Sequence, residues 1–393
     1  MKVFSFYVNR KIFIYLFQIF MLLFLSSTIF KFESSGVLSQ IITFVYFSFL
    51  IIVIFIYFNV SFTICYPDIF FFIYSIIVVS SSLYSLDIKL AFIFNFWFVF
   101  YVFIPYFLFR FFNVLFDDIN NQLPKISTYL ILLFGIIAFL LTPEMFNYAR
   151  FGTNNINPIA LGSILFPLIL ISSYGIFNLK YSKIFIFFSI SITIFGMYIV
   201  VGTGSRGIIY SFFIALLLHS CIANKKWISI KTTISAVSLF LIFYMVITNF
   251  QIFNNSENLL YRYTASSDSQ SMIERYNFYN VAYNMFIENP LLGQGSGSFQ
   301  AHSNGAYVHN IILENLSSFG VFGTLFLVLW FLAVLIIYKR SSVSSSLSSF
   351  LLFMFLISII VKLSSFSFVH YKDIAIWSAL LINVSLYYRR VVA

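Results

Sequence analysis

Residues Gln251 to His309 read QIFNNSENLLYRYTASSDSQSMIERYNFYNVAYNMFIENPLLGQGSGSFQAHSNGAYVH, and the organisation of the whole chain can be worked out from this segment. It stays polar over about sixty residues, roughly ten times the length of a typical connection between secondary-structure elements. The sequence on either side consists of apolar runs joined by short loops. The segment is therefore predicted to be one large loop between membrane spans, and most polar side chains available for chemistry lie in it.

The composition identifies the flanking apolar runs as membrane spans. Of the 393 residues, 61% are hydrophobic and only 9% are charged, whereas soluble domains carry about 25% charged residues. Since a span needs about 20 apolar residues, we predict an all-α polytopic membrane protein with about twelve transmembrane helices. The candidate spans are residues 12–30, 37–59, 69–86, 90–112, 128–146, 158–178, 184–201, 208–223, 228–250, 310–338, 347–363 and 373–388.

This pattern divides the chain into three parts. Residues 1–250 form a membrane bundle with the first nine spans, residues 251–309 form the large loop, and residues 310–393 carry the last three spans. The first apolar run, residues 12–30, is too long for the apolar region of a cleavable signal peptide. We therefore count it as a span.

The distribution of Lys and Arg sets the orientation in the membrane. With the N-terminus in the cytoplasm, fourteen Lys and Arg residues fall on the cytoplasmic side and eight on the outer side. The cytoplasmic residues mostly come in pairs at loop ends, as topology signals do. We therefore expect both termini in the cytoplasm and the large loop outside. The same residues account for much of the net charge of +10, so no nucleic-acid partner is expected.

Several common kinds of site are not indicated by the sequence. The run Gly202 to Gly207 has the spelling G-x-G-x-x-G, but it joins two apolar spans, and position 227, where a dinucleotide-binding fold needs an acid, is Trp227. The cysteines Cys65 and Cys221 offer no disulfide framework. No spacing of His, Cys and carboxylate residues resembles a metal site. We expect neither a metal nor a cofactor.

Four single arginines fall on the outer side and differ from the paired cytoplasmic residues. Arg150 precedes a polar loop that includes Asn157, Arg206 lies in the glycine-rich turn 202–207, and Arg262 and Arg275 lie in the large loop. Such arginines can anchor a helix at the lipid headgroups. They can also bind phosphate oxygens in a bidentate manner, and they stay charged at any working pH. Both interpretations are open on the sequence alone.

A helix is predicted inside the large loop. Apolar and aromatic residues recur there at spacings of 4, 3, 4 and 3, which is typical of one helix face: Met272, Tyr276, Tyr279, Tyr283 and Phe286. Arg275 falls about 60° from the centre of this stripe, and Glu274 falls nearly opposite. Such an amphipathic helix can lie on the bilayer with its arginine at headgroup depth.

The loop ends on a histidine with two possible roles. His309 can be an ordinary interfacial residue of the aromatic belt. It can also be a general base, because an unperturbed histidine pKa of about 6.5 suits proton removal near neutrality. Asn310 beside it is a candidate to bind sugar hydroxyls.

Three pieces in a fixed order carry a resemblance to a known family. They are the turn Gly204 to Gly207 that opens a span, the arginine-bearing segment that leads into 289-NPLLGQG-295, and His309-Asn310 followed by Leu313, Gly320 and Gly323. Together they resemble the O-antigen polymerase/ligase family, whose members are bacterial inner-membrane enzymes that move lipid-linked glycans on the periplasmic side. The resemblance covers roughly residues 150 to 340.

The resemblance implies roles for individual residues. Arg206 and Arg275 match the arginines thought to hold the diphosphate of the donor, and His309 matches the histidine thought to act on the acceptor. Arg150, Arg262, Asn157 and Asn310 are added as candidate substrate-binding residues. Where the family often carries an acid, two residues before the first glycine of the last motif, this chain has Ser318, and Glu314 lies one turn earlier.

The predicted function follows from this resemblance. It is a metal-independent, inverting O-antigen polymerase, a glycosyltransferase that joins repeat units carried on undecaprenyl diphosphate, in the bacterial inner membrane with its active site on the periplasmic side. The implied partners are the lipid-linked donor and acceptor, membrane lipid, and a chain-length regulator protein as a candidate. Two alternatives stay open: a ligase that joins finished glycan to lipid A core, and a lipid-linked oligosaccharide flippase or other transporter. Transporters tend to show internal repeats, and no repeat is evident here.

Overall fold

The structure is a computed structural model that describes residues 19, 21–23, 63–111, 116–141, 158–178, 181–203, 206–223, 270–341, 345–365 and 367–392. The secondary structure within these ranges is helical, without a strand, and this agrees with the predicted all-α class. The chain forms two compact units. The first consists of Met1–Asn59, Val114–Ile208 and Phe253–Leu259, and the second of Val60–Asn113, Ile209–Ile252 and Leu260–Ala393.

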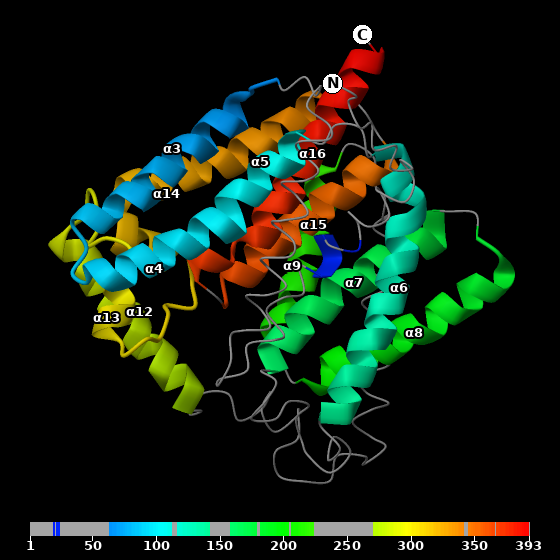
Figure 1. Cartoon of the computed structure of the whole chain (residues 1–393), viewed down its shortest axis with the longest axis horizontal. Coiled ribbons are helices and arrows are strands. Elements are labelled where there is room, and N and C mark those ends of the chain that lie inside the picture. The colour runs from blue at the N-terminus through cyan, green and yellow to red at the C-terminus, as the bar shows by residue number, and fades with distance from the viewer. Residues whose placement is uncertain are drawn as a thin grey trace, which may run out of the picture. The chain divides into compact units, whose positions relative to one another are not determined.

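The helices are labelled in Figure 1. The first unit contains α6 (Phe116–Leu141), α7 (Pro158–Asn178) and α8 (Lys183–Gly202). Helix α9 (Arg206–Ile222) begins within the Val114–Ile208 segment of the first unit and continues into the second unit. The second unit also contains α3 (Tyr66–Ser80), η2 (Ser81–Leu83), α4 (Ile88–Phe98), η3 (Val99–Phe103), α5 (Ile104–Phe111), α12 (Gln270–Glu288), α13 (Ser298–His302), α14 (Ile311–Arg340), α15 (Ser346–Lys362), η5 (Phe368–His370) and α16 (Lys372–Val392).

Four of the described helical segments are long and apolar enough to cross a membrane, namely Tyr66–Leu83, Ile88–Arg110, Lys183–Gly202 and Ile311–Arg340. Four shorter apolar helices accompany them, at Gln122–Ala138, Leu161–Phe177, Gly207–Ile222 and Ser346–Lys362. These helices support a membrane protein. The predicted spans 12–30, 37–59 and 228–250 lie wholly or largely outside the described residues, so the number of twelve stays a prediction.

Small and hydroxyl side chains bring the helices of the first unit together. Gly196 of α8 lies so close to α6 that a Cβ atom there would be 2.7 Å from Cγ2 of Ile131. Between α6 and α7, the hydroxyls of Thr128 and Ser172 share a hydrogen bond of 2.8 Å. Membrane helices associate through such close contacts and interhelical hydrogen bonds, since lipid supplies little hydrophobic driving force between them.

The core of the second unit is aromatic. The ring of Phe71 in α3 lies 4.1 Å from that of Tyr106 in α5 and 4.5 Å from that of Trp330 in α14, centroid to centroid. Nearer the loop end of α3, Tyr74 donates a hydrogen bond of 2.8 Å to the side-chain oxygen of Asn315 in α14. These contacts hold α3 along α14, and the two helices lie side by side in Figure 1.

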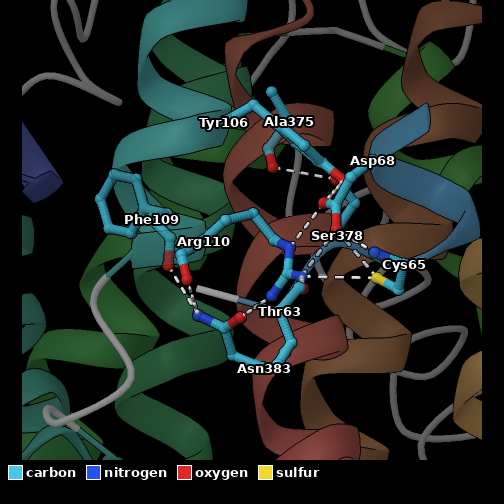
Figure 2. A network of polar contacts seen from close by, with 9 residues as sticks. All are labelled: Thr63, Cys65, Asp68, Tyr106, Phe109, Arg110, Ala375, Ser378 and Asn383. Carbon is cyan, nitrogen blue, oxygen red and sulfur yellow. Dashed lines mark hydrogen bonds and ion pairs between the residues drawn. The ribbon is translucent and has the colours of Figure 1, made fainter. Parts of the chain in front are cut away.

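A buried polar network joins three helices of the second unit (Figure 2). Arg110 near the end of α5 forms an ion pair of 2.7 Å with Asp68 near the start of α3, and it also donates to the side-chain oxygen of Asn383 in α16. The Asp68 carboxylate accepts further hydrogen bonds from the hydroxyl of Tyr106 and the backbone amide of Cys65. The remaining guanidinium nitrogen, Nη2 of Arg110, donates to Oδ2 of Asp68 at 2.8 Å. Every nitrogen of the guanidinium and both carboxylate oxygens therefore have partners, as buried charges require.

Candidate active site

Helices α12 and α13 lie at the end of the second unit where α3 gives way to α4 and where α14 begins (Figure 1). The helix predicted within the large loop is therefore present, as α12. Of the predicted stripe, Tyr276 and Tyr283 are exposed, while Tyr279 and Phe286 are partly buried. Tyr279 packs against the buried core of this region, so only part of the predicted stripe is an exposed face. Tyr276 and Tyr283 can face a bilayer, and contact with lipid stays a prediction.

Helix α12 also has an inward face that the sequence analysis did not identify. Ala282 and Met285 are buried and pack with Phe299 of α13 and Val308, which lies just before α14. Phe278, one turn earlier, packs against the same cluster. This small core fixes α12 against the start of α14 and places Arg275, which lies one turn before Phe278, beside the same region.

The glycine-rich run and α14 form one interlocked unit. Backbone amides of Gln294 and Gly295 donate hydrogen bonds of 2.9 Å to the carbonyls of Ser317 and Ser318, and the amide of Val321 donates to Pro290 at 2.8 Å. These bonds are possible because α14 is broken at Gly320, where φ is 63° and ψ is −162°. The motif NPLLGQG and the glycine-containing break of α14 are therefore joined by backbone hydrogen bonds.

The contact leaves no room for side chains at the two glycines of the interlock. A Cβ atom at Gly320 would lie 2.3 Å from the carbonyl oxygen of Leu291, and one at Gly293 would lie 2.4 Å from the carbonyl carbon of Ser318. Both glycines also have a positive φ, which L side chains adopt at a cost. The spacing of these glycines thus has a direct steric reason.

The turn between α3 and α4 holds the glycine-rich run from its other side. The hydroxyl of Ser85 donates to the carbonyl of Ser296 at 2.7 Å, and the amide of Ser296 donates to the hydroxyl of Ser81 at 3.0 Å. The amide of Leu86 donates to the hydroxyl of Ser298 at 3.2 Å. Serines more than 200 residues apart in the sequence therefore fix the loop between α3–α4 and α14.

His309 is held between two aromatic rings at the start of α14. Its ring lies 4.1 Å from that of Tyr307 and 6.4 Å from that of Phe278, with the latter pair stacked at 21°. The backbone of His309 is left-handed, with φ 61°. Its Nδ1 is buried and has no hydrogen-bond partner in the described part of the chain.

The surroundings favour a neutral imidazole on His309. Burial, followed by the positive charge of Arg275, lowers the pKa of His309 to about 4. Burial also raises the pKa of Tyr307, and the Arg275 charge acts on it in the opposite direction. The positive charge of Arg275 therefore acts on both side chains. A shared site for Arg275 and His309 stays a prediction.

Asn310 follows His309 in the chain, and its side chain has partners within the protein. Its Oδ1 accepts hydrogen bonds from the amides of Ile312 and Leu313, which caps α14, and its Nδ2 donates to the carbonyl of Leu363 at 3.3 Å. Glu314, for which the sequence analysis had no role, is buried one turn further along α14. Binding of sugar hydroxyls by Asn310 stays a prediction.

The other candidate residues are placed less fully. Arg206 is the first residue of α9, as expected for an arginine in a turn that opens a span, but its side chain is outside the described part of the structure. Arg150, Asn157 and Arg262 also lie outside the described residues. The two-arginine arrangement with Arg206 therefore stays a prediction.

The aromatic residues that flank His309 were missed by the sequence analysis. Phe278 was available from its position, because it lies one turn after Arg275 on the predicted helix. Tyr307 gave no signal, since a tyrosine is common in this chain, which has 26 of them. Within the described ranges, no group of three or more His, Cys, Asp or Glu side chains could hold a metal ion.

Comparison with known proteins gives one family match. Residues 191–328 match the family model described as O-antigen ligase. This range contains Arg206, Arg275, His309 and the broken helix at Gly320. No curated protein and no solved structure matches the chain. The match of residues 191–328 supports the resemblance of this chain to the O-antigen polymerase/ligase family.

Proposed function

We propose that the protein is an O-antigen polymerase, a glycosyltransferase that joins repeat units carried on undecaprenyl diphosphate at the periplasmic side of the bacterial inner membrane. The observation that supports this proposal is the stacking of His309 with Phe278, which lies one turn after Arg275 in α12, within the matched range of the chain. A cation and a titratable base in one site would suit a reaction in which a phosphate group leaves and a hydroxyl attacks.

The bonds formed and broken, the proton and the electron pair of this reaction are all accounted for by the donor, the acceptor and the residues proposed here. The acceptor hydroxyl oxygen forms a bond to the anomeric carbon of the donor, and the bond from that carbon to the diphosphate oxygen breaks. The hydroxyl proton goes to His309, and the electron pair goes to the leaving diphosphate. Arg275 and Arg206 offset the negative charge that builds on the diphosphate. A single displacement of this kind inverts the anomeric carbon.

The donor itself improves His309 as a base. In the free protein Arg275 contributes to lowering the pKa of His309 to about 4, after burial. A diphosphate bound to Arg275 brings opposite charge to the same place and raises the affinity of the imidazole for a proton. Proton removal from the acceptor is thereby favoured when the donor is in place.

The test uses three variants at normal expression: Arg206→Ala, Arg275→Ala and His309→Ala. Loss of one group that stabilises developing charge costs about a hundredfold to a thousandfold in rate, and loss of a general base costs about a hundredfold to ten-thousandfold. His302→Ala is the matched control, because His302 lies in the same loop and is exposed. If the three variants still build long surface polysaccharide in cells, the proposal is wrong.

The matched family model is described as O-antigen ligase, which favours ligation as the second candidate function. The two functions differ in the acceptor. Purified protein supplied only with lipid-linked repeat units would lengthen the glycan if it is a polymerase. A ligase would leave these units unchanged until lipid A core is added.

A further inference from the structure

Glu314 is a buried acid that the proposed chemistry does not use. Its side chain lies in the first turn of α14, and the residue is 1% exposed. Among the described residues no Lys or Arg makes an ion pair with it. Burying a carboxylate costs free energy unless hydrogen-bond donors surround it. The donors to Glu314 therefore indicate its role in the structure.

The partners of Glu314 come from segments far away in the sequence. Its Oε1 accepts a hydrogen bond of 2.5 Å from the hydroxyl of Ser367, and its Oε2 accepts one of 2.9 Å from the backbone amide of Phe368. Both donors lie in the buried connection between α15 and α16. Glu314 therefore links the first turn of α14 to the connection between α15 and α16.

A second tie joins the same two segments close by. Asn310 at the start of α14 donates to the carbonyl of Leu363, which precedes Ser367 in that connection. The first turn of α14 is thus fastened to the connection at two places, on either side of one helical turn. His309 lies immediately before this fastened turn.

His309 needs such support because its backbone is unusual. A φ of 61° is rare for a residue other than glycine and persists only where the surroundings fix it. A change of φ at His309 to an ordinary negative value would rotate the imidazole away from Tyr307 and Phe278, whose rings now lie beside it. The position of the ring therefore depends on whatever keeps the start of α14 in place.

We propose that Glu314 is a positioning residue for His309, which fixes the start of α14 against the α15–α16 connection through hydrogen bonds to Ser367 and Phe368. The inference rests on the proposed function only in taking His309 as the base. Glu314 acts here as a hydrogen-bond acceptor, and both of its oxygens are used in that way. It takes no proton from the acceptor or from His309.

Two substitutions separate positioning from charge. In Glu314→Gln the amide oxygen accepts from the Phe368 amide, and the amide nitrogen donates to the Ser367 hydroxyl, which can act as acceptor. This variant keeps activity within about threefold and keeps the pH profile, because the contacts survive. Glu314→Ala loses both contacts and lowers kcat by roughly a hundredfold, as a misplacement of about 1 Å can do, with KM for the donor little changed.

The controls and a second measurement keep the proposal testable. Ser317→Ala removes a buried hydroxyl of the same helix, whose one hydrogen bond among the described residues is to the Glu314 carbonyl, and this variant leaves kcat unchanged. Hydrogen exchange of the amides at residues 307–313, measured without substrate, rises in Glu314→Ala and stays unchanged in Glu314→Gln. Should Glu314→Ala fail to fold, Ser367→Ala replaces it and gives a smaller rise in exchange and a smaller loss of kcat.

Several outcomes would overturn the proposal. If Glu314→Gln is as inactive as Glu314→Ala, the charge matters and positioning is the wrong role. If the alanine variants leave the exchange of residues 307–313 unchanged, Glu314 does not hold the start of α14. Failure of the proposed function has a different signature, since His309→Ala would then stay active whatever the exchange measurements show.

Discussion

The Nε atom of Arg110 lies 2.7 Å from Oδ1 of Asp68, and each of the two side chains is 2% exposed. This ion pair joins the start of α3 to the end of α5, whereas the other end of α3 leads to Ser81, which binds the glycine-rich run. The two ends of α3 are about 20 Å apart at 1.5 Å per residue. An ion pair therefore holds the start of α3, and the other end of this helix contacts the candidate active site.

Breaking this ion pair on one side is expected to destabilise the protein strongly. Asp68→Ala leaves the Arg110 guanidinium buried without its partner, at a cost of about 3–5 kcal/mol. The double variant Asp68→Leu with Arg110→Met removes both charges and should lower the stability less than Asp68→Leu or Arg110→Met alone. Thermal unfolding of the purified proteins in detergent compares the double variant with these two single variants. Equal damage in the single and double variants would contradict this account.

The interlock predicts different costs at glycines that all have a positive φ. Gly293→Ala and Gly320→Ala meet backbone atoms within 2.4 Å, whereas a Cβ atom at Gly305 meets nothing within 4 Å. Gly305→Ala should therefore lose only the left-handed backbone preference, about 1–2 kcal/mol. The other two should lose considerably more and give poorly folded protein. Yield of monodisperse protein and the midpoint of thermal unfolding compare them directly.

The pKa of His309, lowered to about 4 from an ordinary value of 6.5 by burial and by Arg275, predicts a neutral imidazole from pH 6 to 8. As the pH falls, the unfolded chain binds a proton at this imidazole before the folded protein does. The free energy of unfolding is therefore highest above pH 6.5 as far as His309 is concerned, and it decreases between pH 6.5 and about 4. Titration of the imidazole by nuclear magnetic resonance, assigned with His309→Gln, measures the pKa.

Arg275→Gln should raise the pKa of His309, because it removes the second cause of the shift and leaves burial in place. Glu274→Gln is the control, since the neighbouring Glu274 is exposed on another side of α12. A pyrophosphate-containing donor analogue added to the unaltered protein should raise the same pKa. An unchanged pKa in Arg275→Gln would show that the arginine is too far away to take part.

The two cysteines are expected to react at very different rates. Burial raises the pKa of the Cys65 thiol to about 12, and the thiol lies within hydrogen-bond distance of the Asp68 carboxylate. Cys221, near the end of α9, is exposed. Maleimide at pH 8 should therefore label Cys221 and spare Cys65, as peptide mass spectrometry can show. In whole cells a membrane-impermeant maleimide should not reach Cys221, because the predicted topology places it on the cytoplasmic side.

Sequence reasoning reached the parts of this protein that depend on composition and local pattern. Apolar runs predicted most of the long described helices, including the candidate span 69–86, which corresponds to the membrane-length segment Tyr66–Leu83. The helical period predicted α12, and the order of short motifs indicated the family. These signals are local, so they need no knowledge of which segments meet in space.

What the sequence left open are the partnerships between distant segments. The helical period predicted one stripe on α12, but the structure divides that stripe: Tyr279 packs against the core formed with Phe299 and Val308, and Tyr276 and Tyr283 are exposed. Nothing in the sequence indicated that the serines of the α3–α4 turn form hydrogen bonds with the glycine-rich run. Glu314 looked like a displaced family acid until its hydrogen bonds to Ser367 and Phe368 were seen.

By itself, the sequence determined that this chain is a helical membrane protein, which residues are apolar enough to cross a bilayer, and where its arginines and His309 stand along the chain. The tertiary structure decided which groups meet: Phe278 of α12 with His309, the glycine run with the broken α14, and Asp68 with Arg110. The physical reason is that hydrophobicity and helical period act over a few residues, whereas a buried polar contact is fixed only when distant helices pack together.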